Sequence, residues 1–110
     1  MQQTSLPQLV AELLEQAREA SSGRAATTLH GGHEQHLRQT VISLLAGRSL
    51  GEHNTPGEAT LQVLTGSVTL VAGESSCHAS AGDYLVIPPQ RHNLTAVDDA
   101  AVLLSVATGM

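Results

Sequence analysis

The first twenty residues carry apolar side chains at the spacing of one face of an α-helix. Their positions recur at intervals of three and four residues: Leu6, Leu9, Val10, Leu13, Leu14 and Ala17. Ser5 followed by Gln8 is a typical capping box, and Pro7 fits the first turn because its missing N–H costs little there. The pattern predicts a helix over residues 6–20 that ends before Gly23 and packs against a sheet or a partner subunit.

After Gly23 the pattern changes to short runs rich in β-branched and aliphatic residues, separated by turn residues. We predict strands within residues 24–30, 37–47, 60–66, 67–73, 84–89, 92–97 and 101–107. The runs 60–66 and 67–73 meet at Gly66 and read as a hairpin. Many short strands with regular turns are typical of a sandwich or barrel and not of alternating βαβ units. The sequence therefore predicts an all-β fold with an N-terminal α-helix, in which residues 1–23 form the helix and residues 24–110 form the barrel domain.

Composition narrows the possible functions. The chain has 110 residues, enough for one domain, and a net charge of −5 with Tyr84 as its single aromatic residue. Phosphate contacts and base stacking both lack the side chains they need, so we exclude a nucleic-acid partner. No run approaches the roughly 20 apolar residues that span a bilayer, and the N-terminus lacks a secretory signal pattern. Cys77 is the single cysteine, which excludes an internal disulfide, so we predict a cytoplasmic protein without a membrane partner.

Two motifs stand at the ends of the central region. Residues 51–66 read GEHNTPGEATLQVLTG, with His53 before a Pro-Gly turn and a closing glycine. Residues 82–92 carry Gly82, five residues, Pro88 and then His92. These stretches resemble the first and second motifs of the cupin superfamily, and the resemblance covers most of the chain after Gly23. It implies a cupin-like double-stranded antiparallel β-barrel (jelly roll).

The resemblance also implies a metal site, because cupins hold one divalent ion with two histidines and a glutamate of the first motif and a histidine of the second. Here Thr55 stands at the second histidine position and Ala59 at the glutamate position. His53 and His92 are the two predicted metal ligands that remain. Imidazole pairs suit Zn, Ni, Fe or Mn, so one divalent transition metal ion is the predicted cofactor, and weak or absent occupancy is the alternative.

Neighbouring donors could complete the site. Glu58 and Gln62 share strand parity with Thr60, while the intervening residues Ala59, Leu61 and Val63 are apolar. If the polar set faces the barrel interior, Glu58 or Gln62 is a further ligand. If instead it faces solvent, the apolar set fills the core.

The stretch from His30 to His36 contains three histidines around Gly31-Gly32, which predicts a loop. Such histidines lie on the surface, or His33 and His36 reach the barrel mouth as additional ligands. Arg38 follows, and an inward guanidinium would bind a carboxylate. We predict ligand contacts from Arg38, Thr55 and Tyr84.

These features lead to competing functions. The first is a module that binds a metal ion or a small-molecule ligand through a reduced site in the barrel. The alternative is a metal-dependent oxygenase, isomerase or lyase acting on a small organic molecule, and a third is a structural cupin with a vestigial site. The broad apolar stripe of the helix and the resemblance to cupins both predict a homodimer.

Overall fold

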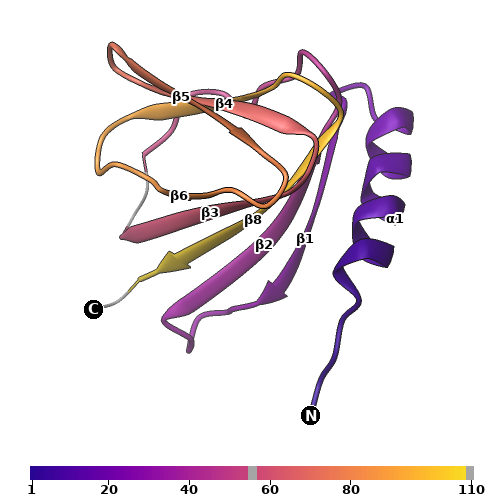
Figure 1. Ribbon diagram of the computed structural model, residues 1–110. Coiled ribbons are helices and arrows are strands. Elements are labelled where there is room, and N and C mark those ends of the chain that lie inside the picture. The colour runs from indigo at the N-terminus through magenta and orange to yellow at the C-terminus, as the bar shows by residue number, and fades with distance from the viewer. Residues whose placement is uncertain (55–56, 109–110) are drawn as a thin grey trace.

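The structure is a computed structural model that describes residues 1–54 and 57–108. The chain forms one helix followed by eight strands: α1 (Leu6–Glu19), β1 (Arg24–His30), β2 (Leu37–Leu44), β3 (Glu58–Thr65), β4 (Ser67–Ala72), β5 (Ser75–Ser80), β6 (Tyr84–Val86), β7 (His92–Ala96) and β8 (Ala100–Ala107). Figure 1 shows two layers of strands with α1 standing beside β1 and β2. The helix in the described part of the chain is too short and too polar to cross a membrane.

The helix begins and packs as its sequence predicts. Ser5 is the N-cap, and its hydroxyl accepts a hydrogen bond from the Gln8 amide at 3.4 Å. Val10, Leu13 and Ala17 are the buried residues of the apolar stripe. The helix is one residue shorter than predicted, because the backbone of Ala20 is already extended.

The strands form two antiparallel sheets. The larger sheet has the order β1-β2-β8-β3-β6, and the smaller has the order β5-β4-β7. A segment before β3 extends the smaller sheet along β7, through hydrogen bonds from Gly47 to Ala96 and from Leu50 to Leu94 and a bridge between His53 and His92. The two sheets face each other as a jelly-roll barrel, so the predicted fold class is confirmed.

The predicted hairpin of residues 60–73 is wrong. β3 pairs with β6 and β8 in the larger sheet, whereas β4 pairs with β5 and β7 in the smaller one. The chain changes sheets at Gly66, where φ is +73° and a side chain would collide with the carbonyl oxygen of Asp99. Two consecutive strands with a glycine between them look the same in sequence whether they pair or cross between layers, because pairing depends on distant strands.

The main core lies between the two sheets and consists of inward-facing aliphatic residues. They include Leu44, Ala59, Leu61, Val63, Val68, Leu70, Ile87, Leu94 and Val102. A second core lies on the outer face of the larger sheet, where Leu13 of α1 packs with Val41 and Ala101. The helix thus covers one half of that outer face, over β1, β2 and part of β8.

Candidate ligand site at the histidine pair

His53 and His92 are held together by the backbone. The amide of each residue donates a hydrogen bond to the carbonyl of the other, with N···O distances of 3.0 and 3.1 Å. Their rings meet edge to face, with centroids 4.5 Å apart and an interplanar angle of 68°. His92 is buried, with 2% of its surface exposed, and His53 is half-buried. Two residues 39 positions apart in the sequence therefore form one side-chain pair inside the barrel.

The backbone also fixes which ring nitrogen carries the proton. Nδ1 of His53 lies 3.0 Å from the carbonyl oxygen of Gly51, and Nδ1 of His92 lies 2.9 Å from that of Gln90. A carbonyl oxygen can only accept, so each Nδ1 must donate its proton. In the neutral rings Nε2 then keeps its lone pair, which is the arrangement found in metal-ligating histidines and in histidines that accept a hydrogen bond from a ligand.

On the inner side of the barrel the surroundings of the pair are aliphatic. The cavity beside the two rings has a volume of about 10 Å³ and is lined by Ile42, Leu50, Leu61, Leu70, Ile87, Leu94 and Leu104. This volume is about that of one water-sized probe, so no organic molecule fits there without movement of the lining side chains. This lining was not predicted from the sequence, although the alternation of aliphatic residues within the strands contained the signal for it.

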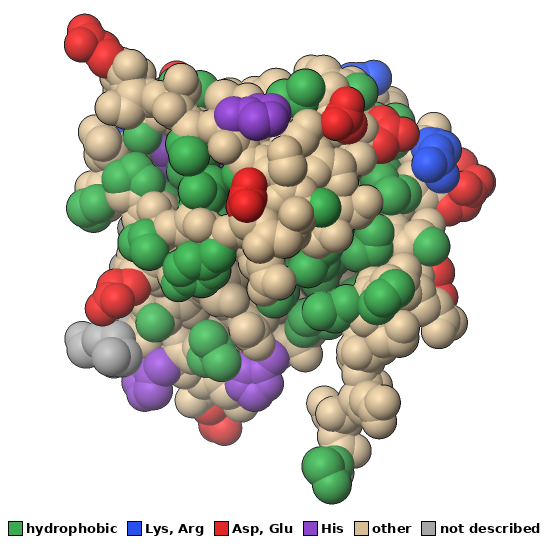
Figure 2. Space-filling view, viewed as in Figure 1, with side chains coloured by type: hydrophobic (Ala, Val, Ile, Leu, Met, Phe, Trp, Pro, Cys, Tyr) green, Lys and Arg blue, Asp and Glu red, His purple; other side chains and the backbone are tan. Residues whose placement is uncertain are grey.

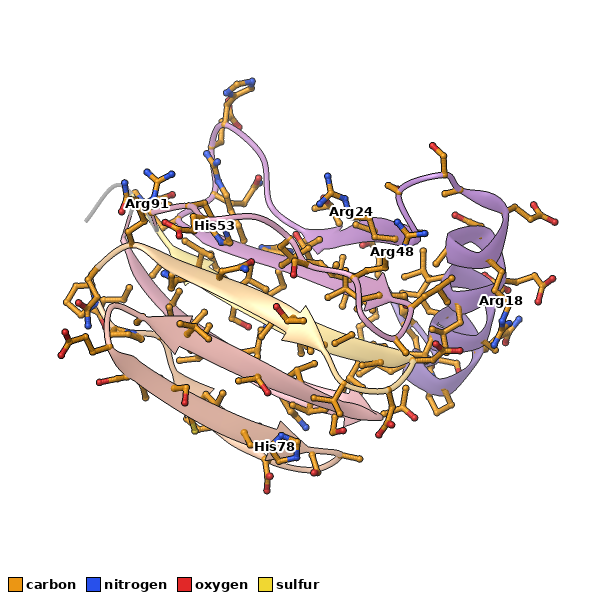
Figure 3. The ribbon with its side chains drawn as sticks, turned by 90° about the horizontal axis from the view of Figure 1, so that it is seen from above. Arg18, Arg24, Arg48, His53, His78 and Arg91 are labelled. Atoms are coloured by element: carbon orange, nitrogen blue, oxygen red, sulfur yellow. The ribbon has the colours of Figure 1, made fainter. Side chains whose placement is uncertain are left out.

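An ion pair lies beside the histidines at the rim. Glu52 precedes His53 and Arg91 precedes His92, and the Arg91 guanidinium contacts the Glu52 carboxylate at 2.7 Å. Both side chains are about 62% exposed, so the pair contributes little stability. Figure 3 shows Arg91 next to His53 at one end of the barrel. Sequence reasoning missed this ion pair too, because it forms only after the bridge between the histidines aligns the two segments.

The polar residues of β3 face away from the histidine pair. Ala59, Leu61 and Val63 are buried in the core, whereas Glu58 and Gln62 are exposed on the outer face of the larger sheet. Of the two alternatives that the sequence leaves open, the structure shows the one with the apolar set inside. Glu58 and Gln62 are therefore not brought to the histidines.

The other predicted site residues are dispersed. His33 lines a hollow beside Arg38, and the Nδ1 atom of His36 lies 2.9 Å from the Thr108 carbonyl oxygen. Tyr84 is 62% exposed on β6, opposite Gln62 on the outer face of the sheet. Thr55 lies outside the described residues.

The positions of these residues show whether they could hold the divalent metal ion that the resemblance to cupins implies. Within residues 1–54 and 57–108, no three His, Cys, Asp or Glu side chains come together as a possible metal group. Two imidazoles in an aliphatic cavity fall short of the three or four protein ligands of a typical transition-metal centre. The described residues therefore do not fit a resident metal of the usual cupin kind.

The two facing antiparallel sheets and the inward histidine pair define the class of protein: a small jelly-roll barrel. The cupin domain profile matches residues 40–107. The chain belongs to the cupin family. None of the curated proteins compared with this sequence matches it.

Solved structures agree with this assignment. A conserved Streptococcus pyogenes protein of unknown function is 28% identical, with a TM-score of 0.74 over 83% of this chain and 79% of its own. A cupin superfamily protein from Desulfitobacterium hafniense is 17% identical, with a TM-score of 0.79 over 99% and 94%. An RmlC-like cupin from Desulfovibrio desulfuricans is 27% identical, with a TM-score of 0.67 over 76% and 81%.

Proposed function

We propose that this chain is a binding module whose contact group is the His53–His92 pair. The observation that carries the proposal is the hydrogen bond from each Nδ1 to a backbone carbonyl, which leaves the Nε2 lone pair of each neutral ring available to a ligand. Such a pair can ligate one transition metal ion, with Zn, Ni and Fe or Mn as the candidates, or accept hydrogen bonds from a small ligand. Because no third His, Cys, Asp or Glu among the described residues joins the two imidazoles, the affinity for an ion should be weak.

The alternative of a metal-dependent cupin enzyme has less support. Such an enzyme needs a metal held firmly enough to keep open positions for its substrate. The position of the family's glutamate holds Ala59, which is buried among aliphatic residues. The cavity of about 10 Å³ on the inner side of the rings has no room for an organic substrate, and the recess of about 560 Å³ that His92 shares with Glu52 and Arg91 lies outside that cavity.

Isothermal titration of untagged protein with ZnCl₂ or NiCl₂ tests the proposal. We expect weak binding of one ion per chain, and we expect the double variant His53→Ala/His92→Ala to bind at least about tenfold more weakly. His78→Ala is the matched control, because His78 is exposed on the edge strand β5, far from His53 in Figure 3. A double variant that binds as the parent does would refute the assignment.

We further propose that the protein is a homodimer that associates through the uncovered half of the larger sheet. Tyr84 and Val86 are 62% and 70% exposed on β6, beyond the part of the outer face that α1 covers. Figure 2 shows hydrophobic side chains gathered over the same side of the molecule as β3 and β6 in Figure 1. Two large apolar side chains exposed side by side at the sheet edge favour association, with the polar Gln62 and Thr60 of β3 beside them.

Light scattering coupled to size-exclusion chromatography measures this directly. Val86→Glu should shift the mass from about twice 11.4 kDa to that of one chain. Val97→Glu changes a valine that is 50% exposed outside the sheets and should keep the parent's mass. A parent protein that remains monomeric at all concentrations contradicts the proposal.

A cytoplasmic location is the remaining part of the proposal. Cys77 is a free, exposed thiol, and an unpaired thiol of this kind suits a reducing compartment. Cell fractionation with an antibody to the protein would test the location, and recovery in an exported fraction would contradict it.

A further inference from the structure

A recess on the β1–β2 hairpin is separate from the cavity of the histidine pair. It has a volume of about 380 Å³ and is lined by Thr28, Gly31, Gly32, His33, Arg38 and Thr40. We call it the hairpin hollow. Neither His53 nor His92 lines it, and its volume falls in the range of small-ligand pockets.

The floor of the hairpin hollow is a pair of threonines. Thr28 of β1 lies directly opposite Thr40 of β2 in the antiparallel register, so their side chains stand on the same face about 5 Å apart. The register shifts between Thr28 and His30, which bends the strand as it enters the loop. Two hydroxyl groups side by side can donate to, or accept from, a polar group on a ligand.

Gly31 lets the loop close over the stem of Arg38. Its φ is +131°, and a Cβ atom built there would lie 3.0 Å from Cγ and 3.1 Å from Cα of Arg38. Only a glycine allows that approach without displacement of Arg38 or of the loop. The packing restricts the aliphatic stem of Arg38 beside the threonines.

The charge of Arg38 is not neutralised by the described protein. Among the residues that the structure describes, Arg38 has neither an ion pair nor a side-chain hydrogen bond. By contrast, Arg18 pairs with Glu15, and Arg91 pairs with Glu52. The described residues that line the hairpin hollow include no Asp or Glu, although the chain carries a net charge of −5. The hollow is therefore a local positive site on an acidic protein.

We propose that the hairpin hollow binds a small hydroxy- or oxo-carboxylate. The Arg38 guanidinium offers a planar fork that matches a carboxylate, and the Thr28 and Thr40 hydroxyls meet the ligand's oxygen substituent. The guanidinium for a carboxylate and the hydroxyl pair for a separate oxygen substituent together favour a hydroxy- or oxo-carboxylate over inorganic phosphate, which has no such substituent. This site goes beyond the proposed function, since it uses neither histidine of the pair.

Titration of ¹⁵N-labelled protein with L-lactate, followed by two-dimensional NMR, tests the inference. We expect saturable shifts of the amides of Thr28, Gly31, Gly32 and Thr40. Arg38→Met removes the charge and keeps an aliphatic stem, and it should weaken lactate binding at least about tenfold. Arg48→Met is the matched control, because Arg48 packs over Gly23 and does not line the hollow, and it should bind as the parent does.

Two further probes define the chemistry of the ligand. L-Lactamide has the shape of lactate without its charge and should cause no saturable shifts in the hollow. Inorganic phosphate should bind more weakly than lactate. The inference is overturned if lactate shifts amides elsewhere, if Arg48→Met weakens binding as much as Arg38→Met, or if lactamide or phosphate binds as tightly as lactate. The metal titration of the histidine pair does not involve Arg38, so the two proposals can fail separately.

Discussion

Replacing Ala59 with glutamate tests whether residue 59 lies where a third metal ligand, beside His53 and His92, would complete a cupin metal centre. Ala59 is 4% exposed and faces the interior two residues from Leu61, which lines the cavity of the histidine pair. The Ala59 carbonyl also accepts a hydrogen bond from the amide of Ile87, another residue of that lining. A carboxylate on Cβ of residue 59 would thus enter the space next to His53 and His92.

Without a metal the new carboxylate should destabilise the protein. Buried glutamates can have a pKa raised by about 3 units, and each unit corresponds to about 1.4 kcal/mol, so the expected loss at pH 7 is about 4 kcal/mol. A raised pKa means that the folded state binds the proton more tightly than the unfolded state. The electrostatic part of the loss should therefore nearly vanish below about pH 4 and grow as the pH rises toward 7.

Zinc should then restore stability, because the carboxylate supplies a third ligand. At a zinc concentration one hundred times its Kd, the gain in the free energy of unfolding is about 2.7 kcal/mol. Urea denaturation with and without ZnCl₂, at pH 5 and pH 7, measures both effects.

Ala96→Glu is the matched control for this experiment. Ala96 is 2% exposed on the inner side of β7, four residues from His92, which places it about 13 Å away along the strand. The control variant should lose similar stability at pH 7 and gain none from zinc. Equal responses of the two variants to zinc would refute the assignment of residue 59 to the metal position.

The two other predictions concern packing. The Ser43 hydroxyl is fully buried and has no hydrogen-bond partner in the described structure, so Ser43→Ala should raise the free energy of unfolding by about 1 kcal/mol. Ser67→Ala is the comparison, because it removes a 2.8 Å hydrogen bond to Asp98 and should lower the free energy of unfolding by a similar amount. Thermal unfolding of both variants measures these changes, and a Ser43→Ala variant less stable than the parent would contradict the prediction. Leu13→Ala should lower the free energy of unfolding by about 2–5 kcal/mol, because Leu13 is fully buried between α1 and the sheet. Glu12 is exposed on the same helix, so Glu12→Ala should change the free energy of unfolding by less than about 0.5 kcal/mol. A small effect at Leu13 would show that α1 is not docked as described.

The local elements could be predicted from the sequence because their signals are local. The capping by Ser5, the apolar stripe through Leu13 and the strand boundaries at glycines and prolines all depend on neighbouring residues. The sequence could not show that the chain changes sheets at Gly66, because that depends on β8 and β7, which come later in the chain. The orientation of Glu58 was open for the same reason, since alternation fixes two faces and only tertiary packing decides which one is inside.

The histidine pair was partly predictable as well. The resemblance to the two cupin motifs implied that His53 and His92 belong together, and the structure places their rings 4.5 Å apart. The motifs could not show the space around the rings, because the cavity there is what remains between side chains from seven separate segments. Leu50, Leu70 and Leu94 are ordinary strand residues in sequence, and only their convergence closes the cavity to about 10 Å³.

This closure bears on where a ligand can bind. Aliphatic side chains packed to the density of a protein interior resist displacement, because opening the cavity would forfeit apolar contacts worth about 25 cal/mol for each Å² exposed to water. The hairpin hollow requires no such opening, since Thr28, Arg38 and Thr40 already face a space of about 380 Å³. Binding of an organic ligand in the hairpin hollow would therefore cost less free energy than binding at the barrel centre. A single ion would need little space beyond that beside the two histidine rings. By volume, the cavity of the histidine pair can take no more than one ion or one water-sized donor, whereas the hairpin hollow has room for the carboxylate that we propose there.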